Sequence, residues 1–148
     1  AMVTGNIRHY AASIEKLKKV VDARPGEEIF GMTMIVSKGK TILVADTNVT
    51  ELPSSERLIK ISKSCVRIAR LFGFEPKVAF LSHSMPALHS AAISTKLMKV
   101  FGGGKNIGPL LIGLGQPIEV APLRASTSEI LNLASIAAYS SDVIDYSI

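Results

Sequence analysis

Cysteine and aromatic residues are scarce in this sequence. Its 148 residues include one Cys, no Trp and only 5% aromatic residues. The single thiol, Cys65, excludes a disulfide framework and fits a reducing compartment, so we expect a cytoplasmic protein. So few aromatic rings also argue against a surface on which single-stranded nucleic acid would stack.

Long apolar runs and targeting patterns are lacking as well. No apolar stretch reaches the ~18 residues that a membrane span needs, so no contact with a membrane is expected. The amino end shows no signal-peptide pattern. It reads "AMVTGNIRHY", without a Met start, which predicts a piece of a longer protein.

The composition is that of one compact domain. Hydrophobic residues make up 47% and charged residues 20% of a chain long enough to bury a core. The formal net charge is +5. The cations gather on the polar faces of two amphipathic patterns, which favours solvated helix faces. Attraction of phosphate-bearing ligands is the alternative, ahead of double-stranded nucleic acid. These cations are Lys16, Lys18, Lys19, Lys60, Lys63, Arg67 and Arg70.

Four segments have helical patterns. Apolar residues recur every three or four positions over residues 6–23 and 54–72, the second stretch beginning near Pro53 and ending at Gly73. Cys65 lies on the apolar stripe of the second helix, which favours a small core residue over a nucleophile. Residues 86–101 form a third pattern. The last pattern starts at Ser126, with Glu129 three residues on as a capping box, and the tail from Ser140 is expected to fray.

Between these helices lie apolar runs of the strand type. Residues 28–37 and 40–47 flank Lys38-Gly39 and predict a tight hairpin, and residues 77–82, 107–114 and 117–120 are further strands. Alternating helices and apolar strands predict an α/β fold of three layers, αβα, with a mainly parallel sheet. Ligands bind such sheets at the strands' carboxyl ends, here "ADTN", "LSHS" and "APLRAST".

Several near-motifs do not carry chemistry. The run "FGGGKNIGP" matches neither a phosphate loop nor a dinucleotide fingerprint, and helix termination explains it better. The three histidines, His9, His83 and His89, have no Cys, Asp or Glu at ligand spacing, so no metal is expected. Adjacent Ser and His in "SHS" point to opposite faces of a strand and cannot form a catalytic pair. Taken alone, these residues indicate no enzyme.

Two ordered strings resemble the phosphate acetyl/butyryl transferase family. They are "VADTNVTELPSSERLIKISKSCVRIARLFGFEPKVAFLSHS" and "MPALHSAAISTKLMKVFGGGKNIGPLLIGLGQPIEVAP". Within that family the chain is most similar to the phosphotransacetylase-like domain at the carboxyl end of large bacterial NADP-dependent malic enzymes. The resemblance implies a phosphotransacetylase-like fold of the isocitrate and isopropylmalate dehydrogenase type. It makes residues 1–148 a fragment of that domain, without the malic enzyme catalytic domain.

The resemblance also implies a gap between Ser84 and Met85. In the family, the two strand ends at this point are separated by further helix and strand units. At ~30 residues per βαβ unit, roughly sixty residues are missing, leaving parts 1–84 and 85–148. Three explanations are open: the segment is present in the protein but skipped by the numbering, it was deleted from the expressed piece, or it was lost from the gene. We favour the first explanation, which predicts a Ser84–Met85 Cα separation far above the ~3.8 Å of a trans peptide.

Family members carry a Ser-Arg pair and then an Asp before the last helix, which bind substrate and assist thiolate attack on acetyl phosphate. Aligned on "EILN", these positions hold Pro122, Leu123 and Glu129 here, and Arg124 lies one residue late. Without a fixed guanidinium the clamp for phosphate is lost, so acetyl transfer is not expected. Glu129 is better explained as the capping-box partner of Ser126.

Two main functions remain open. The first is a regulatory and assembly domain that binds acetyl-CoA without catalysis, forms homo-oligomers and accompanies a malic enzyme domain, which alone would hold NADP and a divalent metal. The second is an active phosphate acetyltransferase, and a structural remnant without ligand is a third. Each ligand-binding candidate has a plain role in loop formation or helix capping as its alternative. The candidates are Ser82, Ser84, Gly108, Pro109, Arg124 and Ser126.

Overall fold

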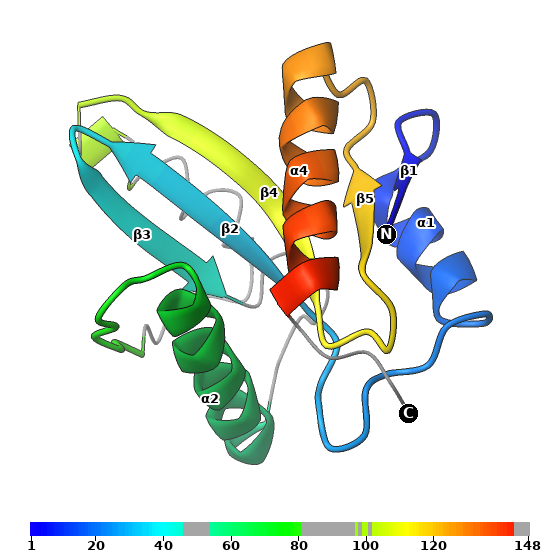
Figure 1. Cartoon of the computed structure of the whole chain (residues 1–148), viewed down its shortest axis with the longest axis horizontal. Coiled ribbons are helices and arrows are strands. Elements are labelled where there is room, and N and C mark those ends of the chain that lie inside the picture. Colours follow the sequence, from blue (N-terminus) through cyan, green and yellow to red (C-terminus); the bar gives the residue numbers. More distant parts are fainter. Residues whose placement is uncertain (46–53, 81–96, 98, 101, 144–148) are drawn as a thin grey trace.

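The computed structural model describes residues 1–45, 54–80, 97, 99–100 and 102–143 (Figure 1). Helices and strands alternate along most of this part of the chain. In chain order the elements are β1 (Met2–Gly5), α1 (Tyr10–Leu17), β2 (Phe30–Ser37), β3 (Lys40–Ala45), α2 (Ser55–Leu71), β4 (Lys105–Ile112), β5 (Ile118–Ala121) and α4 (Thr127–Val143).

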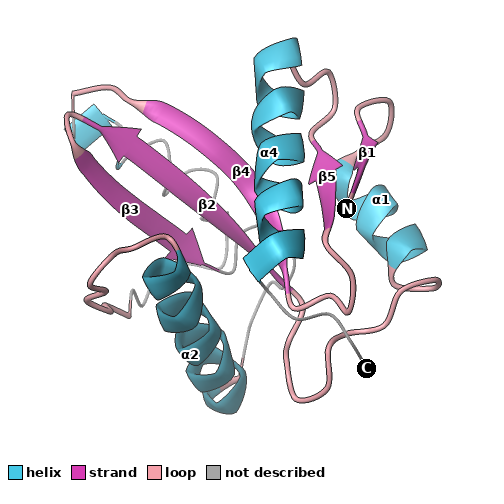
Figure 2. Ribbon diagram, viewed as in Figure 1, coloured by secondary structure: helices cyan, strands magenta, loops and turns pink. Residues whose placement is uncertain are grey.

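The strands form one parallel and one antiparallel group (Figure 2). β1 pairs with β5 in parallel, and β3, β2 and β4 pair in that order as an antiparallel sheet. The predicted α/β class is confirmed. Among the described strands, only β1 and β5 pair in parallel. The tight turn after β2 returns β3 along it in the opposite direction, and β4 is antiparallel to β2 as well.

The predicted hairpin at Lys38-Gly39 is confirmed. Ser37 pairs directly with Lys40, so only two residues make the turn. Both have positive φ, 47° at Lys38 and 75° at Gly39. Two consecutive left-handed residues are the signature of the turn whose twist matches that of the strands. The local sequence therefore determines the register of β2 and β3.

Helix α2 begins and ends where its sequence predicts. The Ser54 hydroxyl accepts a hydrogen bond from the Arg57 amide at 3.3 Å, which caps the first turn. After the helix, Gly73 has φ 78°, and the Phe74 amide donates to the Ala69 carbonyl at 2.9 Å. This left-handed ending satisfies carbonyls of the last turn. Cys65 packs against the core, as its place on the apolar stripe predicts.

Two hydrophobic clusters place helices on both faces of the sheets. One joins α2 and α4 to strands β2, β4 and β5, and the other joins α1 to β4 and β5. Figure 1 shows α4 in front of β4 and beside β5. The layers are therefore αβα, as expected. Buried side chains of the first cluster are Phe30, Met32, Ile61, Ile68, Leu110, Ala121 and Leu133, and of the second Ile14, Leu17, Leu111, Leu114, Ile118 and Val120.

The structure corrects three local expectations. The helix predicted over residues 6–23 is only Tyr10–Leu17, and residues 2–5 before it form strand β1. Residues 77–80, predicted as part of a buried strand, are outside any strand and exposed. Helix α4 continues through Ser140 to Val143, where fraying was expected. Most of the helix predicted at 86–101 lies outside the described residues.

Candidate functional site

The carboxyl ends of β1 and β5 lie side by side. Gly5 pairs with Ala121, and the next amide, that of Asn6, donates to the Ala121 carbonyl at 3.2 Å. The Arg124 amide donates to the Asn6 carbonyl at 3.0 Å. Asn6 and Arg124 have φ of 70° and 60°, which is uncommon without glycine and clusters at functional sites. In the described part of the chain, the buried Oδ1 of Asn6 has no hydrogen-bond partner.

Helix α4 starts directly beyond this loop with the predicted capping box. The Ser126 amide and hydroxyl donate to Oε2 of Glu129 at 2.7 and 2.6 Å, and the Glu129 amide donates to the Ser126 hydroxyl at 3.3 Å. These bonds from the Ser126 hydroxyl and amide hold the pKa of Glu129 below its ordinary value. The carboxylate thus occupies the end of α4 where a phosphate would be favoured.

Gly108 and Pro109 lie inside β4, away from a strand end. Between Met32 and Met34 the pairing of β2 with β4 shifts register, which is a bulge at this position. Gly108 has φ 123°, and a Cβ there would lie 2.9 Å from the Met32 carbonyl oxygen. The glycine is required by this close approach of two backbones. Of the other candidates, Arg124 and Ser126 share one loop, and Ser82 and Ser84 lie outside the described residues.

A buried carboxyl, Glu119, was missed by sequence reasoning. It is 4% exposed, and its Oε2 accepts a hydrogen bond from the Leu111 amide at 2.8 Å. Burial raises its pKa to about 8, against the lowering effect of that bond. Burial and the Glu119 charge together also raise the pKa of Tyr10. The only signal in the sequence is an acid within the four-residue apolar run Ile118–Ala121.

Glu119 lines a small crevice between β4, β5, α2 and α4. The polar members of its wall are Arg24, Arg67, Gln116, Glu119 and Ser140. Because the folded carboxyl keeps its proton near neutral pH, the crevice wall contains a neutral acid as well as the side chains of Arg24 and Arg67. Such a group can donate a hydrogen bond that an ionised carboxylate cannot.

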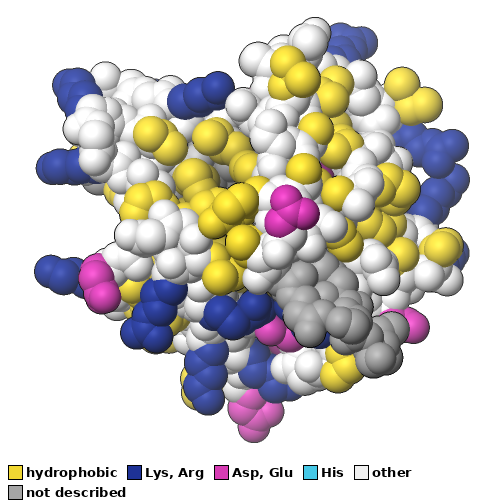
Figure 3. Space-filling view, viewed as in Figure 1, with side chains coloured by type: hydrophobic (Ala, Val, Ile, Leu, Met, Phe, Trp, Pro, Cys, Tyr) yellow, Lys and Arg dark blue, Asp and Glu magenta, His cyan; other side chains and the backbone are white. Residues whose placement is uncertain are grey.

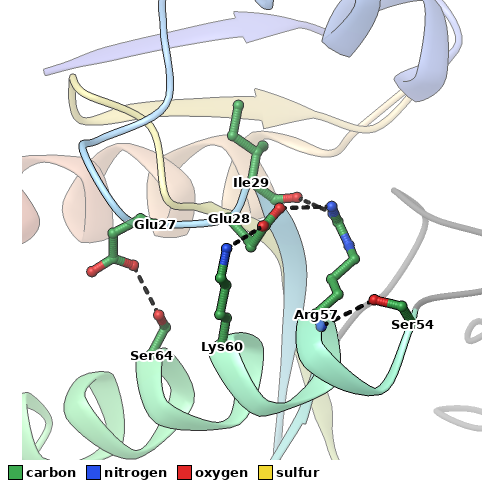
Figure 4. A network of polar contacts seen from close by, with 7 residues as sticks. All are labelled: Glu27, Glu28, Ile29, Ser54, Arg57, Lys60 and Ser64. Atoms are coloured by element: carbon green, nitrogen blue, oxygen red, sulfur yellow. Dashed lines mark hydrogen bonds and ion pairs between the residues drawn. The ribbon is translucent and has the colours of Figure 1, made fainter.

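Cations of α2 pair with the loop before β2 (Figure 4). Arg57 donates to Glu28 at 2.7 Å and to the Ile29 carbonyl at 2.9 Å, and Lys60 also reaches Glu28, at 3.2 Å. The Ser64 hydroxyl donates to Glu27 at 2.8 Å. Part of the predicted solvated face of α2 therefore holds this loop against the helix.

The described residues hold no group of three or more His, Cys, Asp or Glu side chains suited to a metal ion. None of the helices within the described ranges is long and apolar enough to cross a membrane.

A profile of the family described as phosphate acetyl/butaryl transferase matches residues 1–85 and 85–138. This chain belongs to that family. The two matches share residue 85 and together span all but the last ten of the 148 residues.

Relatives in this family include two kinds of enzyme. The NADP-dependent malic enzyme of Rhizobium meliloti is 30% identical, with 93% of this chain and 26% of the relative covered. The phosphate acetyltransferase of Nitratidesulfovibrio vulgaris is 29% identical over 75% of this chain and 16% of the relative. The chain thus spans about a quarter or less of these proteins. A solved structure, the EutD phosphotransacetylase from Staphylococcus aureus, has a TM-score of 0.74 at 16% identity, covering 93% of this chain and 62% of that one. The predicted phosphotransacetylase-like fold is confirmed.

The malic enzyme comparison also bears on the predicted gap. The match extends over 198 positions but uses 93% of the 148 residues here, about 138. About 60 positions (198 − 138) therefore have no counterpart in this chain. The shared residue 85 of the two family matches coincides with the predicted seam. The explanation that the numbering hides a segment stays a prediction, because its test is the Cα separation across this seam. The Ser84–Met85 distance itself lies outside the described residues.

Proposed function

We propose that this chain is a non-catalytic phosphotransacetylase-like domain that binds acetyl-CoA and regulates a malic enzyme. One observation carries the proposal: the loop after β5 lacks the groups for acetyl transfer. The positions of the family's Ser-Arg pair hold Pro122 and Leu123. The Asp position holds Glu129, whose carboxylate is committed to the capping box with Ser126.

The same loop keeps features that suit binding. Arg124 supplies a guanidinium for a phosphate group, on a backbone held by Asn6. The buried Oδ1 of Asn6 is an acceptor available to a donor on the ligand. Binding there, at the ends of β1 and β5, matches the general location of ligands in α/β sheets. The relatives' names support a malic enzyme partner that would hold NADP in its own domain. A divalent metal in that domain is what the family resemblance implies.

The test combines turnover and binding in the purified chain. We expect no CoA-dependent consumption of acetyl phosphate above a blank, but a calorimetric signal with acetyl-CoA. Arg124→Ala should weaken acetyl-CoA binding roughly tenfold, as expected for loss of one phosphate contact of ~1.5 kcal/mol. Arg70→Ala is the matched control, because Arg70 is an exposed arginine on α2. Equal weakening by both variants would contradict this location.

An active phosphate acetyltransferase is the second candidate, favoured by the family and by the acetyltransferase relative. Turnover well above the blank would establish it and end the regulatory proposal. Neither turnover nor heat on adding acetyl-CoA would instead indicate a structural remnant.

A further inference from the structure

Asn6, the residue after β1, joins the two strand ends of the candidate site. Its amide donates to the Ala121 carbonyl at 3.2 Å, and its carbonyl accepts from the Arg124 amide at 3.0 Å. Both backbone polar groups of Asn6 are therefore engaged within the protein. Its carboxamide is not, because in the described part of the chain the buried Oδ1 atom has no hydrogen-bond partner.

The backbone at this point would suit glycine better than asparagine. Asn6 has φ 70°, a left-handed conformation that glycine adopts without strain and asparagine only tolerates. Gly5 before it has φ 105°, and a Cβ there would collide with the Ala121 carbonyl oxygen, so the chain passes tightly over the end of β5. The loop thus contains a carboxamide that its backbone conformation does not require.

The unpaired oxygen of Asn6 gives the site a preference among ligands. A buried acceptor without a partner is unfavourable, because it has lost its hydrogen bond to water. A ligand that donates a hydrogen bond to Oδ1 removes this penalty, whereas a ligand without a donor keeps it, and sites of this kind reject analogues that lack the matching donor. Asn6 as a whole is partly exposed, so rotation of its carboxamide can bring the oxygen to a ligand at the loop.

Arg124 supplies the second half of the recognition. Its guanidinium has donors only and favours a phosphate group, and its backbone is bonded directly to that of Asn6. Figure 3 shows Lys or Arg side chains and no visible Asp or Glu on this face where α4 starts. The nearby carboxylate of Glu129 is held by Ser126 in the capping box. A ligand that satisfies both Asn6 and Arg124 therefore presents a phosphate together with a hydrogen-bond donor.

We propose that Asn6 determines the specificity of this site: it favours a phosphate-bearing ligand that also has an N–H or O–H donor, and it disfavours a bare acyl phosphate. The inference rests on the proposed function and deepens it. Acetyl-CoA has amide, amino and hydroxyl groups as well as phosphates, whereas doubly ionised acetyl phosphate has no donor at all.

The test compares wild type, Asn6→Gly and Arg124→Ala for binding of acetyl-CoA and of acetyl phosphate, each added alone and followed by calorimetry. Asn6→Gly keeps the left-handed backbone and removes the carboxamide. We expect it to weaken acetyl-CoA binding roughly tenfold and to leave acetyl phosphate binding unchanged, whereas Arg124→Ala should weaken both. The midpoint of thermal unfolding should not fall in Asn6→Gly, because an unpaired buried group is removed. Asn106→Ala is the matched control, since Asn106 is an exposed asparagine on β4.

Each outcome decides the proposal. Weaker binding of acetyl-CoA alone in Asn6→Gly, with normal binding in Asn106→Ala and no loss of thermal stability, supports it. Unchanged acetyl-CoA binding in Asn6→Gly overturns it and leaves the proposed function standing. Equal weakening of both probes also overturns it, because Asn6 would then only hold Arg124 in place. A wild-type chain that does not bind acetyl-CoA overturns this inference and the proposed function together.

Discussion

Replacing Glu119 by Gln should change how the stability of this protein depends on pH. The carboxyl is 4% exposed, and its one described hydrogen bond comes from the Leu111 amide at 2.8 Å. Gln retains an acceptor oxygen for that amide and has nearly the same shape. The substitution therefore removes the titration of position 119 while keeping the contact between β4 and β5.

The size of the effect follows from the raised pKa. The folded carboxyl has a pKa of about 8, against 4.5 for the ordinary group. Between these values the native protein binds a proton that the unfolded chain releases, so the free energy of unfolding falls as pH rises. The slope approaches ~1.4 kcal/mol per pH unit, and the loss levels off above the folded pKa. This contribution is fully present below pH 4.5. At this slope, a rise of two pH units removes a large fraction of the ~5–15 kcal/mol by which small domains are stable.

Urea unfolding followed by circular dichroism measures this directly. We expect the wild-type free energy of unfolding to fall between pH 5.5 and 7.5 relative to Glu119→Gln, whose curve lacks that slope. Glu75→Gln is the control for removing one acidic group, because Glu75 is exposed. Parallel curves for wild type and Glu119→Gln would refute the inference that a neutral carboxyl is buried between the strands.

Two further predictions concern hydrogen bonds of the helices. Ser126→Ala should lower the free energy of unfolding by ~1 kcal/mol in urea, because it removes the cap of α4. Because the pKa of Glu129 is lowered in the folded protein, the stabilisation by its carboxylate should be present above pH 4.5 and lost as pH falls through the folded pKa. Equal free energies of unfolding for Ser126→Ala and wild type would contradict this role of the capping box. Arg57→Ala should cost ~1–3 kcal/mol by the same assay, since its guanidinium holds Glu28 and the Ile29 carbonyl. Lys63 is an exposed neighbour on α2, and Lys63→Ala should change the free energy of unfolding by less than ~0.5 kcal/mol. Similar losses in Arg57→Ala and Lys63→Ala would argue against a stabilising contact between Arg57 and the loop before β2.

Much of the candidate site could be predicted because its interactions are local. The capping box of Ser126 and Glu129 joins residues three apart, and the hydrogen bonds at both ends of α2 join residues close in sequence. The place of Arg124 after β5 was likewise readable from the order of strand, loop and helix. Its contact with Asn6 was not, since more than one hundred residues separate the two.

The sequence by itself determined the hairpin at Lys38-Gly39, the ends of α2, the start of α4 and membership of the phosphate acetyl/butaryl transferase family. Only the tertiary structure decided that residues 2–5 form a strand, because β1 exists through its pairing with β5 at the far end of the chain. It also decided the protonation of Glu119, since a carboxyl keeps its proton only when β4, β5 and the helices together exclude water from it. Neighbouring residues determine turns and helix caps, whereas burial and long-range strand pairing depend on which distant segments of the chain pack together.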